Sequence, residues 1–205
     1  MAYRCIAIAS AALLCLSTQR VSAQPTGGVV FVGSSIIHRW TNLADQMAPL
    51  PVVNRGFDGA VTSDMLRVLD SLVVPLRPKV IVYYCGSNDV DAGQAARAIA
   101  ARIQLFFTRA AAALPEVGIV FLSVIRAPEK RDRWRIVDEV NALIQAAVSN
   151  RNGLEYLDVN VALVDARGAP RMDLYMPDEL HLRPAAYEAV ARFVKPVLTK
   201  SLERR

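Results

Sequence analysis

The segment Val80–Asp89, with the sequence VIVYYCGSND, decides how the rest of the chain is interpreted. Every residue from Val80 to Cys85 is apolar or aromatic, so a strand formed here has no polar face to turn toward water. Such a strand is typical of a parallel sheet that helices cover on both sides. The apolar run stops at Gly86, and polar residues follow at once. This segment therefore predicts a central parallel strand with polar groups at its carboxyl end.

Four further apolar runs alternate with helical patterns along the chain. The predicted strands cover residues 28–32, 51–54, 118–124 and 154–159, and the predicted helices cover about 62–72, 93–113, 133–148 and a last segment that starts at Pro184. Pro75 and Pro78 end the first of these helices, and Ser63 or Thr62 is its expected N-cap. Strands joined by helical crossovers place helices on both faces of a sheet. We therefore expect an α/β fold, a three-layer α/β/α sandwich with a mainly parallel sheet of about five strands.

Residues 1–23 have the pattern of a secretory signal peptide. Arg4 precedes an apolar run from Cys5 to Leu16, and small residues end the segment at Ala23. The run is too short to span a bilayer. A mitochondrial-type presequence, an uncleaved anchor and a lipoprotein signal are the alternatives. We expect a single domain over residues 24–205, a secreted or periplasmic location, and no stable membrane anchor after cleavage.

Composition narrows the classes of function. Hydrophobic residues make up 53% of the 205-residue chain, which argues against disorder and suffices for the core of one domain. The net charge of +5 comes from scattered arginines without a nucleic-acid motif, so we expect no nucleic-acid partner. Cys85 is the one cysteine after the signal, and it is predicted to be a small core residue outside any disulfide. No cysteine and histidine cluster has zinc spacing, and we expect no metal or organic cofactor.

Polar residues follow several predicted strands, at the edge where open parallel sheets bind ligands. Ser34 and Ser35 follow the first strand, and Asp178 and His181 lie in the loop before the last helix. A serine nucleophile needs a base, and His181 is a candidate base whose ring Asp178 can orient. Each serine is otherwise a possible helix cap, and an Asp–His pair at this spacing also occurs in ordinary surface loops.

Two other loops carry groups suited to stabilising a negative oxygen. Asn88 has a side-chain amide, and Gly59 lets a backbone N–H approach a ligand closely. A helix cap and a simple turn are the respective alternatives. His38 falls one helical turn after Ser35, and we expect it at the surface or rim without a role. Nucleophile, base, acid and two donors at one sheet edge indicate acyl transfer.

In this order and spacing, the blocks resemble those of the SGNH hydrolases, also called the GDSL esterase/lipase family. The resemblance runs from about Val29 to Val194 and is carried by Gly33-Ser34-Ser35-Ile36, Asn54-Arg55-Gly56-Phe57-Asp58-Gly59, Gly86-Ser87-Asn88-Asp89 and Asp178-Glu179-Leu180-His181. It implies a flavodoxin-like SGNH hydrolase fold. The sequence has no Gly-x-Ser-x-Gly elbow, which argues against the larger α/β-hydrolase family. Two positions depart from the family pattern. Ser34 stands where aspartate is usual, and Asp58-Gly59-Ala60-Val61 stands where many members have Gly-Gly followed by a hydroxyl or acidic residue.

The resemblance assigns the site residues. Ser35 is the nucleophile, and Asp178 and His181 complete the triad. The oxyanion hole is formed by the Gly59 N–H, the Asn88 side chain and the Ser35 N–H.

The implied activity is that of a serine esterase that works through an acyl-enzyme. A compact domain without a lid insertion favours a short acyl chain, with a small ester or acetylated carbohydrate as substrate. Trp40, Trp134 and Tyr175 are candidates for the rim of the site, with packing as the alternative. An acyltransferase with a sugar acceptor, a non-catalytic carbohydrate-binding relative and a nucleotide binder that uses the Gly33–Ser35 turn are the rival interpretations.

Overall fold

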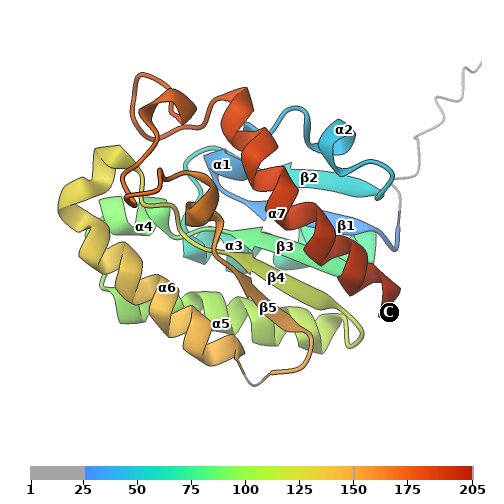
Figure 1. Ribbon diagram of the computed structural model, residues 1–205. Helices are drawn as coiled ribbons and strands as arrows, with labels where there is room; N and C mark the ends of the chain where they lie inside the picture. Colours follow the sequence, from blue (N-terminus) through green and yellow to red (C-terminus); the bar gives the residue numbers. More distant parts are fainter. Residues whose placement is uncertain (1–25, 150, 205) are drawn as a thin grey trace, which may run out of the picture.

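A parallel sheet forms the centre of the computed structural model, which describes residues 26–149 and 151–204 (Figure 1). Its strands are β1 (Val29–Gly33), β2 (Val52–Gly56), β3 (Val80–Tyr84), β4 (Gly118–Leu122) and β5 (Leu154–Leu157). They form one five-stranded sheet in the order β2-β1-β3-β4-β5, and every neighbouring pair is parallel. The predicted fold class is therefore confirmed. The predicted signal peptide, residues 1–23, lies outside the described residues.

The order of the strands fixes where a ligand can bind. From β1 the chain crosses to β2 on one side and then returns to β3 on the other. The loops that follow β1 and β3 therefore diverge, and open α/β sheets bind ligands at the carboxyl ends of their strands at such a point. β1, β3 and β4 are buried along their whole length, which explains their continuous apolar runs, whereas β2 and β5 are the partly exposed edges.

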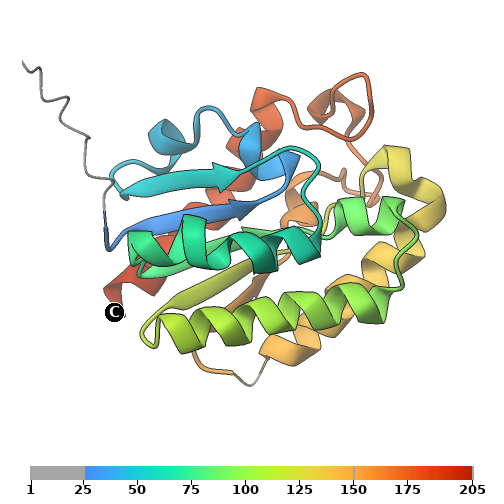
Figure 2. The same cartoon turned by 180° about the vertical axis from the view of Figure 1, so that it is seen from behind.

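Helices cover both faces of the sheet. They are α1 (Ser35–His38), α2 (Leu43–Met47), α3 (Thr62–Val68), α4 (Ser87–Asp91), α5 (Ala96–Ala113), α6 (Trp134–Val148) and α7 (Pro184–Glu203). One buried cluster packs α1, α2 and α7 against the sheet, and a second packs α3, α5 and α6 against the opposite face. Figure 1 shows α7 in front of the sheet, and the reverse view in Figure 2 shows α3 and α5.

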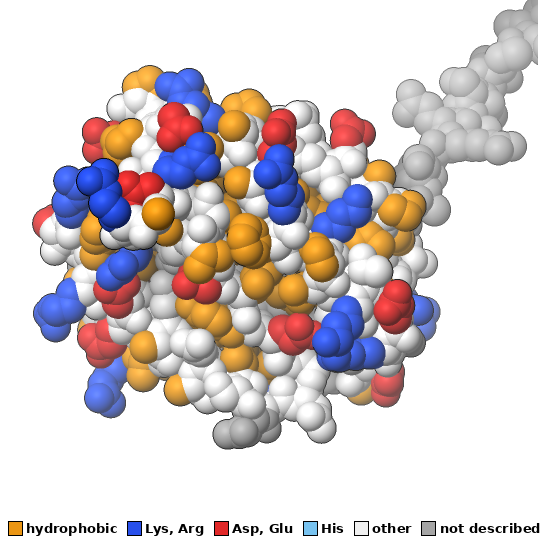
Figure 3. Space-filling view, viewed as in Figure 1, with side chains coloured by type: hydrophobic (Ala, Val, Ile, Leu, Met, Phe, Trp, Pro, Cys, Tyr) orange, Lys and Arg blue, Asp and Glu red, His pale blue; other side chains and the backbone are white. Residues whose placement is uncertain are grey.

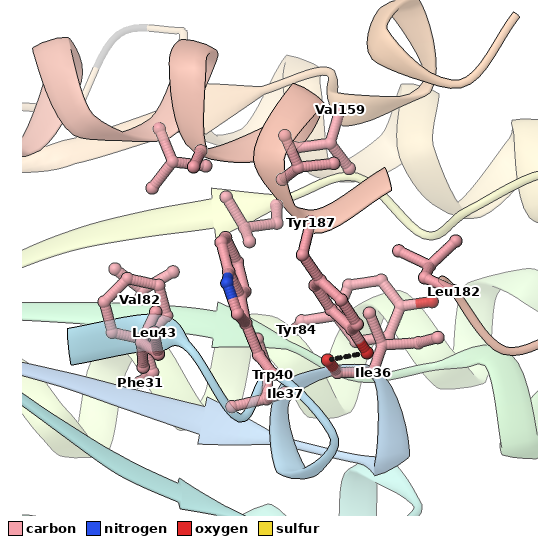
Figure 4. Close-up of a cluster of buried hydrophobic side chains, with 14 of the residues drawn as sticks. Phe31, Ile36, Ile37, Trp40, Leu43, Val82, Tyr84, Val159, Leu182 and Tyr187 are labelled. Atoms are coloured by element: carbon pink, nitrogen blue, oxygen red, sulfur yellow. Dashed lines mark hydrogen bonds between the residues drawn. The ribbon is translucent and has the colours of Figure 1, made fainter. Parts of the chain in front are cut away.

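Two of the aromatic residues that the sequence offers as candidates for the rim of the site lie in the core beneath α7. Trp40 is 2% exposed and packs between Phe31 and Tyr187, with ring centroids 5.7 and 5.2 Å away (Figure 4). The Tyr187 hydroxyl donates a hydrogen bond to the Ile36 carbonyl at 2.9 Å, which ties α7 to α1. Tyr175 is also 2% exposed. Both residues are therefore packing residues, which is the alternative that the sequence left open.

Several local predictions need correction. The helix expected over 62–72 is regular only in α3, and a π turn over Leu69–Val73 and a 3₁₀ turn over Val74–Leu76 follow it. Its N-cap is Val61 rather than Thr62 or Ser63, because the Asp64 carboxylate accepts the Val61 N–H at 3.0 Å. The helix expected over 93–113 begins only at residue 96, and the separate short helix α4 precedes it in the chain.

The prediction for Cys85 is confirmed. Cys85 is fully buried, as expected of a core residue, and burial raises the pKa of its thiol. Across the described part of the chain, no helix combines the length and the apolar character that a bilayer span requires. Figure 3 shows basic and acidic side chains interspersed over the α7 face.

Candidate active site

Ser35 occupies the first position of α1, directly after β1. The connecting turn is tight, because a Cβ on Gly33 would lie 1.9 Å from the Tyr84 carbonyl oxygen of the adjacent strand. The Ser34 N–H donates to that same oxygen at 3.2 Å. Ser35 is 8% exposed and opens the helix, so its N–H is one of the groups that have no partner within the helix. The turn thus presents the Ser35 hydroxyl and N–H at the carboxyl end of the sheet.

The loop before α7 brings an imidazole and a carboxylate to this serine. The distance from His181 Nε2 to Ser35 Oγ is 3.0 Å, and that from His181 Nδ1 to Asp178 Oδ2 is 2.6 Å. The other Asp178 oxygen accepts the backbone N–H groups of His181 and Leu180 at 2.9 and 3.0 Å. Partial burial acts to raise the pKa of Asp178, but the hydrogen bonds from the His181 side chain and from these backbone groups outweigh it and lower the pKa to about 2. The three side chains therefore form a continuous chain with an ionised carboxylate at its end.

The backbone of this loop is held from two sides. The Met176 N–H donates to the His181 carbonyl at 2.7 Å, and the Glu129 N–H donates to the Glu179 carbonyl at 3.2 Å. Glu179 has a φ of +56°, a left-handed conformation that few non-glycine residues adopt. The sharp turn at Glu179 places the carboxylate of Asp178 opposite the ring of His181.

The two predicted oxyanion donors lie in neighbouring loops. Gly59 has a φ of +73°, and a Cβ built there would meet no atom within 4 Å, so open space lies in front of the backbone. The Asn88 side-chain amide donates to the Ala60 carbonyl at 2.9 Å. That amide nitrogen carries two hydrogens, so one of them is fixed by Ala60 and the other is available to a ligand.

The two positions that depart from the family pattern have different surroundings. Ser34 is 1% exposed, and its side chain makes no capping bond to α1. Asp58 accepts Arg39 Nε and Nη2 at 3.2 and 3.3 Å, which links the Gly59 loop to the end of α1. This hydrogen bond is the main reason that the pKa of Asp58 is lowered. His38 is exposed, as expected, and its Nδ1 lies 3.0 Å from the Gly56 carbonyl oxygen.

Sequence reasoning missed two buried polar groups near the site. Asp89 binds Thr62 and Arg102, and Lys130 binds Asp91 and Glu129. Asp89 belongs to a block that the sequence singles out, but its partners lie far away in the chain. Within residues 26–149 and 151–204, no group of three or more His, Cys, Asp or Glu side chains is placed to hold a metal ion.

The third aromatic candidate, Trp134, lies at the start of α6 and is partly buried. Its Nε1 donates to the Ala127 carbonyl at 2.8 Å. The guanidinium carbons of Arg126 and Arg131 lie 5.3 and 5.6 Å from its ring centroid, within cation–π range. Trp134 therefore packs against arginines in this structure.

Known proteins resemble the chain in sequence and in fold. Residues 30–189 match the sequence profile of the GDSL-like Lipase/Acylhydrolase family. Among curated proteins, none matches the chain. A GDSL-like lipase from Bacteroides thetaiotaomicron superposes with a TM-score of 0.72 at 22% identity, over 87% of this chain and 92% of the other.

Two further solved structures have names that specify a substrate class. A carbohydrate esterase family 3 protein from Talaromyces cellulolyticus gives a TM-score of 0.70 at 17% identity, over 88% of this chain and 100% of that one. A variant of an acetyl-xylooligosaccharide esterase from Geobacillus gives a TM-score of 0.66 at 16% identity, over 85% of this chain and 95% of that one. At these identities the likeness establishes the fold.

Proposed function

The chain belongs to the GDSL-like Lipase/Acylhydrolase family, as the resemblance of its sequence blocks predicted, and from this premise we propose that it is a serine esterase for short acyl groups. The observation that carries the proposal is the hydrogen-bonded chain from Ser35 through His181 to Asp178, at 3.0 and 2.6 Å. Few structural roles require a serine, an imidazole and a carboxylate to be joined in this order at a sheet edge.

The first half of the proposed reaction forms an acyl-enzyme. His181 Nε2 takes the proton of the Ser35 hydroxyl as Oγ attacks the ester carbonyl carbon. Asp178 holds the His181 ring in the tautomer that accepts this proton and stabilises the imidazolium. The carbonyl oxygen becomes an oxyanion, which the Gly59 N–H, the Asn88 amide and the Ser35 N–H stabilise. The imidazolium then donates its proton to the leaving alcohol as the C–O bond breaks.

The second half returns the enzyme to its starting state. A water molecule gives a proton to His181 and attacks the acyl carbon, and the same donors stabilise the second oxyanion. When this intermediate collapses, Ser35 Oγ leaves and recovers the proton from His181. The carboxylic acid is released, and no electron donor or acceptor is required.

Acetyl esters of carbohydrates are the proposed substrates. Structural neighbours named as a carbohydrate esterase and an acetyl-xylooligosaccharide esterase support this class. The compact single domain without a lid insertion, as the sequence indicates, also supports a short acyl chain. A secreted or periplasmic location, where such polymers occur, remains part of the proposal.

The decisive experiment is active-site labelling combined with turnover. A fluorophosphonate should label the wild type and fail to label Ser35→Ala or His181→Ala, and His181→Ala should lower kcat/KM by on the order of 10⁴-fold. His38→Ala is the matched control, because it removes the other histidine and should keep most of the activity. Labelling that persists in Ser35→Ala, or near-normal turnover of His181→Ala, would overturn the triad.

A substrate series completes this test. Rates on p-nitrophenyl esters should fall as the acyl chain lengthens beyond a few carbons, and an acetylated xylo-oligosaccharide should release acetate. Product analysis with a sugar acceptor distinguishes hydrolysis from acyl transfer, since a transferase would yield a new acetylated sugar. A wild type that neither turns over nor reacts with the fluorophosphonate would identify a non-catalytic relative.

A further inference from the structure

Asp89 is a buried carboxylate that the proposed mechanism does not use. It is 2% exposed, and it follows Asn88 in the short helix α4. A buried carboxylate is costly unless charges or hydrogen bonds compensate for the lost water. The partners that compensate Asp89 therefore indicate which parts of the fold depend on it.

Those partners come from two other elements. Asp89 Oδ2 accepts the Thr62 backbone N–H at 2.9 Å, and Oδ1 accepts the Thr62 hydroxyl at 2.6 Å. Arg102 Nη2 donates to Oδ1 at 3.1 Å, and Arg102 Nε donates to the Thr62 hydroxyl oxygen at 2.7 Å. Asp89, Thr62 and Arg102 thus form a closed ring of hydrogen bonds, which we call the Asp89 ring.

The Asp89 ring joins the two chain segments that carry the candidate oxyanion donors. Thr62 is three residues after Gly59, and Asp89 is next to Asn88. Between them, the Ala60 carbonyl accepts the Asn88 amide at 2.9 Å and the Cys85 thiol at 3.4 Å. Hydrogen bonds therefore join the Gly59 loop to helix α4 at two places, one at Ala60 and one at Thr62.

We propose that Asp89 is a positioning residue that, through Thr62 and Arg102, fixes the Gly59 N–H and the Asn88 amide at the separation an oxyanion requires. This inference rests on the proposed esterase function. Asp89 is too deeply buried to touch substrate, so it acts through the two loops. Donors that stabilise a transition state must be held in place before the reaction, and a displacement of about 1 Å can cost on the order of 100-fold in rate.

The primary variant is Asp89→Asn, which keeps the shape of the side chain and removes its charge. The asparagine amide has one oxygen that can accept hydrogen bonds. In one orientation the Thr62 N–H loses its acceptor, and in the other the Thr62 hydroxyl and the Arg102 guanidinium lose theirs. We expect kcat to fall roughly 10- to 100-fold while KM stays within about threefold, because the donors act mainly in the transition state. Thr62→Val, which keeps the backbone hydrogen bond, should give a smaller loss in the same direction.

Affinity for an alkylboronic acid provides a readout that a general loss of stability would not move. The boronate forms a tetrahedral adduct on the serine, and its oxygen occupies the oxyanion position. Affinity for this adduct should weaken about as much as kcat falls in Asp89→Asn. The pH at which kcat/KM is half-maximal should stay unchanged, because Ser35, His181 and Asp178 are untouched.

Arg102 and Arg109 form a matched pair for the control. Both lie on α5 and reach across to the segment that begins with α3, which packs beside α5 (Figure 2). Arg102 reaches the Asp89 ring, whereas Arg109 binds the Leu66 carbonyl at 3.0 Å and Asp70 at 2.7 Å, farther along that segment. Arg102→Met should lower kcat and boronate affinity, and Arg109→Met should leave both unchanged.

The outcomes separate the two proposals. An active wild type with an Asp89→Asn variant whose kcat and boronate affinity stay within about twofold overturns the positioning role and leaves the esterase proposal intact. Equal losses in Arg102→Met and Arg109→Met also overturn it, since they indicate general destabilisation. If Asp89→Asn does not fold, the comparison of Arg102→Met with Arg109→Met decides. An inactive, unlabelled wild type overturns the esterase function itself, and the inference falls with it.

Discussion

Ser35 and Asp178 belong to the same hydrogen-bonded chain, yet their surroundings differ. The Ser35 residue is 8% exposed and lies in a turn that packs against a central strand. The Asp178 side chain is 48% exposed, and it lies in a loop that crosses the end of the sheet. One end of this hydrogen-bonded chain is therefore buried in the core, and the other lies on the surface.

The contacts that hold these two regions differ in kind. The turn that carries Ser35 is fixed by the close approach of two backbones, since Gly33 leaves no room for a side chain beside Tyr84. The loop that carries Asp178 is fixed by directed hydrogen bonds, such as the one from Glu129 to Glu179 at 3.2 Å. Added volume should therefore disrupt the first region, and lost polar partners should disrupt the second.

Gly33→Ala should give the largest effect on stability. Its Cβ would lie 1.9 Å from the Tyr84 carbonyl oxygen, so two central strands must separate. We expect a loss of roughly 3 kcal/mol or more in the free energy of unfolding, or failure to fold, because a core this tightly packed tolerates little added volume. Urea denaturation or the yield of folded protein measures it.

Gly59→Ala is the control for that prediction. Nothing lies within 4 Å of its Cβ, so only the left-handed backbone at φ +73° opposes the substitution. The expected cost is about 1 kcal/mol. Equal costs for Gly33→Ala and Gly59→Ala would contradict the idea that close backbone packing holds the Ser35 turn.

Lys130→Met tests the other region. The Lys130 side chain is fully buried, and its Nζ binds Asp91 on α4 at 2.5 Å and Glu129 at 2.8 Å. Because Glu129 holds the loop at Glu179, removal of the ammonium should destabilise the protein by about 1–2 kcal/mol. The loss is moderate, since Arg133 still pairs with both carboxylates at 2.8 and 3.2 Å. Thermal unfolding measures this difference.

Lys200→Met is a suitable comparison, because Lys200 is exposed at the end of α7. Lys200→Met should change the free energy of unfolding by less than about 0.5 kcal/mol. A Lys130→Met variant as stable as Lys200→Met would mean that the buried ammonium contributes nothing to the support of the loop.

The sequence predicts the sheet and the placement of the triad for a clear physical reason. The apolar run from Val80 to Cys85 leaves no polar face, so β3 must be central, and polar residues after parallel strands must gather at one edge. Ser35 and His181, which are 146 residues apart, accordingly lie within hydrogen-bonding distance. Their catalytic roles remain a prediction.

The contacts that support the site are much harder to predict. Asp89 and Thr62 are 27 residues apart, and Lys130 and Asp91 are 39 apart, with no periodic pattern to connect them. The N-cap prediction was wrong for a related reason. The Thr62 hydroxyl binds Asp89 across the fold, and the cap falls to Val61. Tertiary hydrogen bonds of this kind override local propensity.

Asp178→Asn should have the smallest effect on the free energy of unfolding, and this effect should disappear at low pH. The substitution tests how the exposed Asp178 end of the hydrogen-bonded chain is held. The pKa of Asp178 is about 2 in the folded protein, below the usual value near 4 in an unfolded chain. A depressed pKa stabilises the fold above the unfolded value, and this contribution disappears as the pH falls from about 4 through about 2. The side chain is 48% exposed, so solvent screening should keep the contribution below about 1 kcal/mol.

Urea unfolding at a series of pH values between about 6 and 2 measures this contribution. The wild type should exceed Asp178→Asn in stability at about pH 6, and the two curves should converge at the acid end. Asp173→Asn provides the control, because Asp173 is an exposed carboxylate that pairs with Arg171 at 2.8 Å. A difference between wild type and Asp178→Asn that stays constant over the whole range would contradict the charge-dependent contribution. The loop that carries Asp178 would then be held by its backbone contacts, as the turn that carries Ser35 is.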